Sequence, residues 1–424
     1  MNDQNQVMVI GGGITGVTSA LALADNGYRV SLIEKSASIG GHAMQFCCKA
    51  TDQCNSCGVC LAKDKIMKAA SHPGIHILTN TEVIGLKGEG PHFQVEVLKT
   101  PRFIDEYKCI ACSLCYQNCP KPGEAIDRPY LYSVPNAFSI NREHCLYFQK
   151  GEECTICKEN CPADAIFLDQ EEERHTINAS AIVVATGFEV YDARKKGYLG
   201  YGRFPEVISG LDLEQRLLMG EDRIISKSSP EGKPRVAFIQ CVGSRDPHIG
   251  HDYCSRVCCK YAARMAAKLK SKYEEIDLTI FYIDLQKTER DFLALIESLK
   301  EDVHLVKGLP IKIEKVDDCG VTMRYENIDR GCMERADFDL VVLSVGISPS
   351  MESQSLAGVL GVNIDENGFF ASADLMDSTI SSRRGIFLAG TCQGPKNLIE
   401  SISHGQEAAL RTLALMKGLG VNNG

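Results

Sequence analysis

The fold is decided near the amino terminus by residues 7–16, Val7-Met8-Val9-Ile10-Gly11-Gly12-Gly13-Ile14-Thr15-Gly16. The four apolar residues predict a buried strand, and the glycine-rich turn leads into an apolar segment, residues 17–24, that predicts a helix. Glycines permit a tight turn and close approach of the backbone to a pyrophosphate, and the amino terminus of a helix attracts phosphate. The stretch therefore predicts a dinucleotide-binding unit, with a plain strand-turn-helix as the alternative.

The following segment supports this interpretation. Residues 28–33 form a second apolar strand that leads into Glu34, 18 residues after Gly16. A carboxylate at this place would hold the ribose hydroxyls and disfavour a 2′-phosphate. Lys35 and the residues after it continue a pattern that resembles FAD enzymes, in which a second glycine pair approaches the phosphates and the flavin. The cofactor contacts predicted in this part of the chain are Gly11, Gly13, Ile14, Thr15, Gly16, Glu34, Lys35, Gly41 and His42.

Two later segments favour flavin over nicotinamide. Residues 181–187 and 385–392 are apolar strands that look like the segments closing over FAD in flavoproteins of the thioredoxin reductase and glutathione reductase type. Those families usually carry Gly-Asp where this chain has Gly390-Thr391, so the contact to the ribityl chain or pyrophosphate must be rearranged. A helix over about 398–415 would point its amino terminus at the isoalloxazine. The later predicted contacts are Val83, Ala185, Thr186, Gly187, Gly390, Thr391, Gln393 and Gly394.

Eight cysteines predict a pair of iron-sulfur clusters. Two runs, each ending in Cys-Pro, follow the spacing of bacterial ferredoxins, in which the fourth cysteine of each run ligates the other cluster. The interval before Cys154 is longer than usual, and we interpret residues 147–153 as a loop insertion. Disulfides or buried thiols are the alternative. The crossed pairing gives one set of Cys109, Cys112, Cys115 and Cys161, and a second set of Cys145, Cys154, Cys157 and Cys119.

A further group of cysteines follows the Gly40-Gly41 turn, so it should lie near the flavin. Cys54, Cys57 and Cys60 have cluster spacing, and Cys47 or Cys48 could supply the fourth thiolate. A mononuclear zinc would accept the same ligands, and free thiols are another alternative. We favour a [4Fe-4S] cluster, because only a redox cofactor makes use of a place beside flavin.

The middle of the chain carries a fourth cysteine group in place of a nicotinamide loop. After a polar linker over 226–234, the strand 235–240 lies where flavoproteins of this type begin their NAD(P)-binding domain. The expected glycine motif is replaced by residues 241–246, CVGSRD, and a helix is predicted over 253–273. Thiols at a strand end and a helix amino terminus can hold a [4Fe-4S] cluster, with a cysteine-rich core helix as the alternative. The four thiols are Cys241, Cys254, Cys258 and Cys259.

Composition narrows the class of protein. The net charge of -9 argues against nucleic acid or an anionic membrane surface as the main partner, and no stretch has 18 uninterrupted apolar residues. Twenty cysteines in 424 residues fit metal clusters in a reducing compartment better than a secreted disulfide framework, so we expect a cytoplasmic protein without a transmembrane segment. Three cysteines have no visible partners and are interpreted as ordinary thiols: Cys319, Cys332 and Cys392.

Together these motifs resemble HdrA, the flavin-containing component of heterodisulfide reductases, over essentially the whole chain. The resemblance rests on residues 238–246 with 253–259, on 388–396, and on 101–105. It implies a cytoplasmic FAD and iron-sulfur subunit that passes electrons within a larger complex, in the best-known members by flavin-based electron bifurcation. It also implies that the cysteines of 241–259 ligate a cluster near the flavin. Longer members have additional amino-terminal and carboxy-terminal domains, so we expect a short form.

The predicted fold class is α/β, a two-dinucleotide-binding-domain flavoprotein with an inserted α+β ferredoxin domain for two [4Fe-4S] clusters. The expected ranges are 1–101, 171–228 and 336–424 for the FAD domain, 102–170 for the insert, and 229–335 for a degenerate NAD-type domain. We expect FAD, four [4Fe-4S] clusters, no separate catalytic side chain, and other redox subunits and a ferredoxin as partners in a hetero-oligomer. The alternatives are a self-sufficient flavin oxidoreductase acting on a small sulfur or other substrate, and an iron-sulfur sensor.

Overall fold

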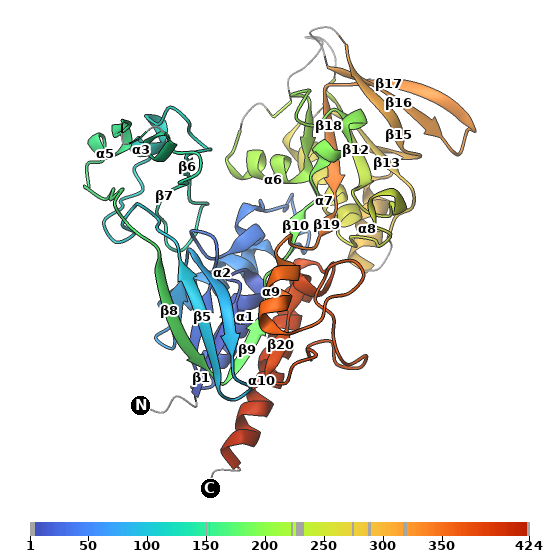
Figure 1. Ribbon diagram of the computed structural model, residues 1–424. Helices are drawn as coiled ribbons and strands as arrows, with labels where there is room; N and C mark the ends of the chain where they lie inside the picture. Colours follow the sequence, from blue (N-terminus) through green and yellow to red (C-terminus); the bar gives the residue numbers. More distant parts are fainter. Residues whose placement is uncertain are drawn as a thin grey trace.

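Two parallel five-stranded sheets form the framework of the chain (Figure 1). The computed structural model describes residues 5–149, 151, 153–221, 224–225, 233–273, 275–286, 290–316 and 320–421. The first sheet has the order β20-β9-β1-β2-β3 and the second β11-β18-β12-β13-β14. Helices cover one face of each sheet, and a three-stranded antiparallel sheet packs on the other, joined in the first sheet by one further helix.

The first sheet is built around the glycine-rich turn. Its strands are β1 (Gln6–Ile10), β2 (Arg29–Ile33), β3 (Ile75–Leu78), β9 (Ala181–Val184) and β20 (Ile386–Leu388). Residues of both faces of β1 are buried, which explains why its sequence is apolar without alternation. The covering helices are α1 (Ile14–Ala24), α2 (Val59–Ser71) and α10 (Leu398–Val421).

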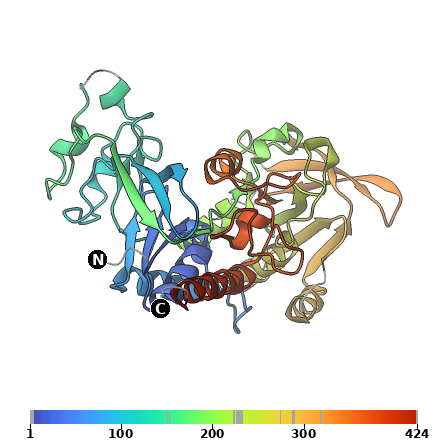
Figure 2. The ribbon, with the colours of Figure 1, turned by 60° about the horizontal axis from the view of Figure 1, so that its bottom comes forward.

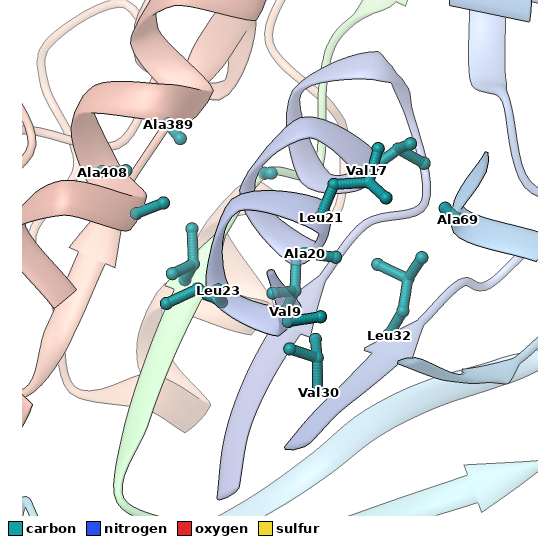
Figure 3. Packing of buried hydrophobic residues seen from close by; sticks show 14 of the residues in the cluster. Val9, Val17, Ala20, Leu21, Leu23, Val30, Leu32, Ala69, Ala389 and Ala408 are labelled. Carbon is teal, nitrogen blue, oxygen red and sulfur yellow. The ribbon is translucent and has the colours of Figure 1, made fainter. Parts of the chain in front are cut away.

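Helix α1 is the central packing element. Figure 3 shows its apolar side chains, among them Val17 and Leu21, over Val9, Val30 and Leu32 of the sheet. Ala408 of α10 belongs to the same core. On the opposite face lie α9 (Ser353–Leu360) and the antiparallel sheet of β4 (Thr81–Lys87), β5 (Phe93–Lys99) and β8 (Glu173–Ala179).

The second sheet corrects two of the expected domain boundaries. Its strands are β11 (Val207–Ser209), β12 (Arg235–Val242), β13 (Asp277–Tyr282), β14 (Val303–Lys307) and β18 (Leu340–Val345). Strands β11 and β18 fall in ranges assigned to the FAD domain, yet β18 is buried throughout and pairs with both β11 and β12. The chain crosses between the sheets at the paired strands β10 (Glu189–Val190) and β19 (Ile347–Ser348).

The second sheet is covered in the same way as the first. Its helices are α6 (Gly210–Leu218), α7 (Cys258–Lys272) and α8 (Arg290–Leu299), and its antiparallel sheet contains β15 (Pro310–Lys315), β16 (Val321–Asn327) and β17 (Cys332–Phe338). Helix α7 begins five residues later than predicted. Arg256 has a φ of +60°, which an α-helix does not allow, and Ser255 Oγ accepts a hydrogen bond from Ile347 N at 2.8 Å.

The insert lies between two neighbouring strands, β5 and β8. It has its own core and contains α3 (Leu114–Gln117), β6 (Ile126–Asp127), β7 (Ser139–Ile140), α4 (Leu146–Gln149) and α5 (Ile156–Glu159). Figures 1 and 2 both show it on one side of the first sheet, with the second sheet on the other. Buried Arg102 attaches it to the first domain, because its guanidinium donates to Ala137 O and Thr79 Oγ1, each at 3.2 Å.

No helix in the described part of the chain is both long enough and apolar enough to cross a bilayer. The linker residues 226–232 and Cys319 lie outside the described residues.

Candidate flavin and cluster sites

A cavity of about 1450 Å³ lies at the carboxyl ends of the strands of the first sheet. This is larger than the roughly 300–1,000 Å³ usual for small-molecule pockets, and it lies where open α/β sheets bind their ligands. The predicted contacts that line it are Gly11, Gly13, Ile14, Thr15, Glu34, Gly41, His42, Ala185, Thr186, Gly187 and Thr391.

The glycines of the turn have different roles. A Cβ added to Gly16 would lie 1.8 Å from Gly11 O, so Gly16 allows α1 to pack closely on the turn, and it does not line the cavity. Gly13 itself lines the cavity, and a Cβ added to it would meet no atom of the described residues within 4 Å and would enter open space. The first turn of α1 contains no acidic residue, so its partial positive charge is available to a phosphate.

Glu34 is held in place by backbone and side-chain donors. Its Oε2 accepts from Gly12 N at 2.6 Å, and its Oε1 accepts from Ser36 N and Ser36 Oγ, both at 2.7 Å. The carboxylate therefore stays at the cavity wall, at the place expected for a ribose contact.

Several predicted contacts lie elsewhere. Lys35 is exposed and forms an ion pair with Glu352, and Val83 packs against the core on the opposite face of the sheet. Gln393 donates from Nε2 to Ser378 O at 2.5 Å, and Gly390 donates from its backbone N to His404 at 2.9 Å. Neither of them, nor Gly394, is among the residues that line the cavity.

Two buried polar atoms in the cavity wall have no hydrogen-bond partner in the described chain. They are His42 Nδ1 and Thr186 Oγ1. The other ring nitrogen of His42, Nε2, lies 3.1 Å from Phe188 O, so the proton belongs on Nε2 and Nδ1 is an acceptor. Burial lowers the pKa of His42, which keeps the ring neutral. The wall therefore presents an unused acceptor and a hydroxyl to a bound molecule, as a polar cofactor requires.

His404 supports the Gly390-Thr391 turn, a role that the sequence did not reveal. Its side chain is buried, Nδ1 accepts from Gly390 N, and Nε2 lies 3.0 Å from Ser378 Oγ. Burial, and then the charge of Lys396, lower the pKa of His404 to about 4. His404 therefore orders the Gly390-Thr391 turn by accepting the hydrogen bond from Gly390 N. This is the turn in which the chain has Thr391 where an aspartate was expected.

The low pKa of His404 predicts a pH-dependent stability. The unfolded chain binds this proton near pH 6.5 and the folded chain only near pH 4, so stability falls as the pH is lowered between these values. Between pH 8 and pH 5.5 the loss from this group should be about 1.4 kcal/mol. His404→Asn keeps an acceptor for Gly390 N but does not titrate. Urea unfolding at the two pH values should show the smaller pH effect in the variant, and equal effects in both proteins would contradict the assignment.

The amino terminus of α10 also reaches the cavity. Asn397 and Glu400 cap the helix reciprocally, since each backbone N donates to the other side chain at 2.8 Å. Arg256 contacts the same turn, with Nη2 at 2.8 Å from Glu400 Oε1 and Nη1 donating to Pro395 O at 3.2 Å. Because Arg256 lies between Cys254 and Cys258, it ties the cysteine loop of the second sheet to the wall of the cavity.

The eight cysteines of the insert gather around two small cavities. One is lined by Cys109, Cys112, Cys115 and Cys161, and the other by Cys119, Cys145, Cys154 and Cys157. These are the two sets that crossed pairing predicts, and ligation itself stays a prediction. Burial raises the pKa of Cys115 to about 12, with Cys109 and Cys112 contributing. The pKa of Cys119 is raised by burial and by Cys145 and Cys154 of the other run.

The four cysteines of the second sheet also lie close together. Cys241 stands at the end of β12 with a φ of +59°, and Cys258 begins α7. Burial raises the pKa of Cys241 to about 11, and the charges of Cys259 and Cys254 add to this effect. The thiols are therefore near neighbours at a strand end and a helix amino terminus.

The cysteines near the Gly40-Gly41 turn are not gathered in this way. Cys57 lines the large cavity, whereas Cys48, Cys54 and Cys60 are exposed. Burial, followed by the charge of Glu214, raises the pKa of buried Cys47 to about 12. A cluster at this group stays a prediction.

No three potential metal-binding side chains of the described residues converge closely enough to hold a single ion. A tetrahedral zinc site needs sulfur atoms about 2.3 Å from one metal, and no such site is preformed among the described residues. Four thiols placed around a cavity instead fit a larger group of several irons.

A buried ion pair joins the Cys47 loop to α6. Lys49 Nζ lies 2.6 Å from Glu214 Oε1, with side chains only 5% and 6% exposed, and Glu214 Oε2 accepts from Cys47 N at 2.9 Å. Glu214→Gln would leave the Lys49 charge buried without a counter-charge. We expect unfolding free energy to fall by about 3 kcal/mol, measured by urea denaturation. The exposed pair of Lys87 and Glu96 is the control, and Glu96→Gln should cost less than about 1 kcal/mol. Equal costs would contradict the prediction.

Comparisons with known proteins first define the class of fold. A family model described as an NAD(P)-binding Rossmann-like domain matches residues 9–50. Thioredoxin reductase of T. acidophilum is similar with a TM-score of 0.54 and 16% identity, covering 97% of this chain and 98% of that one. Thioredoxin reductase of Lactococcus lactis gives 0.55 and 15%, covering 98% and 99%. The predicted two-domain flavoprotein fold is confirmed.

Sequence relatives then give a closer comparison. The HdrA component of the H(2):CoB-CoM heterodisulfide,ferredoxin reductase from Methanothermobacter thermautotrophicus is 33% identical over 98% of this chain. An HdrA iron-sulfur component of the CoB--CoM heterodisulfide reductase from Methanopyrus kandleri is 36% identical over 96%. The predicted resemblance is thus confirmed, and the chain is homologous to HdrA of heterodisulfide reductases along nearly all of its length. It spans 64% of the length of each of these two relatives.

Proposed function

We propose that this chain binds FAD and [4Fe-4S] clusters and transfers electrons between them as one component of a heterodisulfide-reductase-like complex. The observation that carries the proposal is the composition of the large cavity wall. The glycine turn of the first sheet shares this wall with three cysteine-bearing segments, represented by Cys57, by Ala111 and Ser113 of the insert, and by Val257 beside Cys258. Three of the four cysteine groups are therefore next to segments that border the space proposed for FAD.

The residues of the wall fit this assignment. The start of α1 would hold the pyrophosphate, Glu34 the ribose, and the unpaired groups of His42 and Thr186 other polar parts of the cofactor. Flavin exchanges two electrons and iron-sulfur clusters exchange one, so the bound groups would supply two-to-one electron conversion. The protein would hold them close together, while the Arg256 contacts fix the cysteine loop of the second sheet against the flavin domain.

The partners follow from the same homology. The relative from Methanothermobacter thermautotrophicus is named for both a heterodisulfide and a ferredoxin. We include in the proposal other redox subunits and a ferredoxin as partners, a cytoplasmic location, and electron bifurcation at the flavin. The proposal also includes the cluster ligands and FAD contacts predicted from the sequence, among them the cluster ligands of the Cys47 to Cys60 group.

The test is the content of iron, acid-labile sulfide and FAD per chain in protein isolated anaerobically. We expect one FAD and about sixteen irons, or four [4Fe-4S] clusters. A content of about twelve irons would show that the Cys47 to Cys60 group holds no cluster. A content of about eight would show that only the insert holds clusters. A chain without stoichiometric FAD would overturn the proposal. Turnover of a small disulfide by the isolated chain with a reduced dye would favour a self-sufficient flavin oxidoreductase.

A further inference from the structure

Gln240 is a buried polar side chain whose amide has no hydrogen-bond partner in the described part of the chain. It is 1% exposed, and neither its Oε1 nor its Nε2 has a hydrogen-bond partner among the described residues. Buried amides in folded proteins are almost always paired, so this side chain indicates a bound group that the chain itself does not supply. Ser244 is 2% exposed in the turn after Cys241, and its hydroxyl also has no partner among the residues that the structure describes.

The position of Gln240 points to the four cysteines of the second sheet. The cores on the two faces of β12 show that side chains alternate up to Ile239, after which the register shifts before Val242. Gln240 follows Ile239 directly and so continues the face of Val236 and Phe238. Both of those residues pack in one core with Cys259 and the first turns of α7. Gln240 therefore lies on the face of the sheet beneath α7, at the end where Cys258 begins the helix, and it directly precedes Cys241.

We propose that the carboxamide of Gln240 donates a hydrogen bond from Nε2 to a sulfur atom of the cluster held by Cys241, Cys254, Cys258 and Cys259. This inference rests on the proposed function, which places a cluster there. Hydrogen bonds to the sulfurs are one of the factors that set the potential of an iron-sulfur cluster. They stabilise the reduced form more, because it carries more negative charge. Gln240 thus makes this cluster easier to reduce by contacting it directly.

The consequence is a direction for electron flow. A cluster with a raised potential, buried beneath α7 and tied to the cavity wall through Arg256, accepts an electron from flavin more readily than the cluster would without this donor. A single neutral side chain would therefore favour electron transfer from the flavin to the cluster of the second sheet.

The experiment compares Gln240→Leu with Tyr273→Phe. Tyr273 also has a buried hydroxyl without a partner, but it lies at the opposite end of the 15-residue α7, about 22 Å along the helix axis. The readout is a redox titration followed by electron paramagnetic resonance, with the signal of this cluster identified by its loss in Cys258→Ala. Gln240→Leu should lower the reduction equilibrium constant about tenfold, or 59 mV for one electron, while Tyr273→Phe leaves it unchanged.

Stability of the apoprotein separates a specific effect from damage to the fold. Each substitution removes an unpaired buried polar group, so both apo variants should unfold at temperatures equal to or above that of the parent chain. An unchanged potential in Gln240→Leu would show that the amide binds only a water molecule and would overturn the inference. If Gln240→Leu does not fold, Gln240→Met gives the same comparison. Absence of a Cys258-dependent signal in the parent chain would overturn both this inference and the cluster assignment.

Discussion

Replacing Gly13 by valine should lower the affinity for FAD by at least about a thousandfold while the chain still folds. A side chain at Gly13 would meet no protein atom near its Cβ, and the residue lines the cavity at the start of α1. Its φ of -70° is ordinary for any residue. The added methyl groups would instead occupy the place proposed for the pyrophosphate, and a thousandfold loss corresponds to about 4.1 kcal/mol. Titration of the apoprotein with FAD, followed by flavin fluorescence, measures the effect.

The matched control is Gly358→Val. Gly358 lies in α9, also has no protein atom near a Cβ, and does not line the cavity. This variant should bind FAD as the parent chain does. Thermal unfolding of both apo variants checks that neither substitution has disrupted the fold. FAD binding by Gly13→Val at the parental affinity would show that the cofactor does not lie along the glycine turn.

Crossed ligation in the insert predicts a pattern of iron loss that differs from that of sequential ligation. In sequential ligation the four cysteines of each run would hold one cluster. Cys161→Ser should remove about four irons, because one cluster loses a ligand. A second substitution, added to Cys161→Ser, then shows which cysteines share a cluster with Cys161. Cys112→Ser should cost no further iron in the Cys161→Ser background, since both residues line the same cavity. Cys154 lines the other cavity, so Cys154→Ser should bring the loss to about eight irons.

Sequential ligation would give the reverse result. In the Cys161→Ser background, Cys154→Ser would then cost no further iron and Cys112→Ser would cost about four more. Iron and sulfide analysis of the two double variants distinguishes these outcomes. Cys332→Ala serves as a control, since this cysteine is exposed and its thiol donates to Glu334 Oε1 at 3.8 Å. It should retain all of the iron.

The parts of the fold that the sequence predicted well are those specified by local pattern. The strand, glycine turn and helix around residues 7–24 depend on apolar residues and on glycines whose neighbours are close in sequence. The same holds for the cysteine runs, because their spacing matches a short, repeated geometry. Strand β18 is recognisable for a similar reason, since it is a continuous apolar run.

The remaining features depend on contacts between distant segments. The assignment of β18 to the second sheet depends on its pairing with β11 and β12, which no periodicity reveals. His404 becomes a support for Gly390 only because α10 packs beside that turn, and Lys35 is drawn away from the cavity by Glu352. The late start of α7 reflects the contact of Ser255 with Ile347, again across a long interval in sequence.

The attachment of the insert has a consequence for how such chains are assembled. Lys99 at the end of β5 pairs with Glu173 at the start of β8, so the two strand ends that flank the insert are about one strand spacing, 4.8 Å, apart. A short turn could close the same gap without disturbing any pairing of the antiparallel sheet. The insert therefore occupies the place of a hairpin turn, and the pairing of β5 with β8 does not depend on its length.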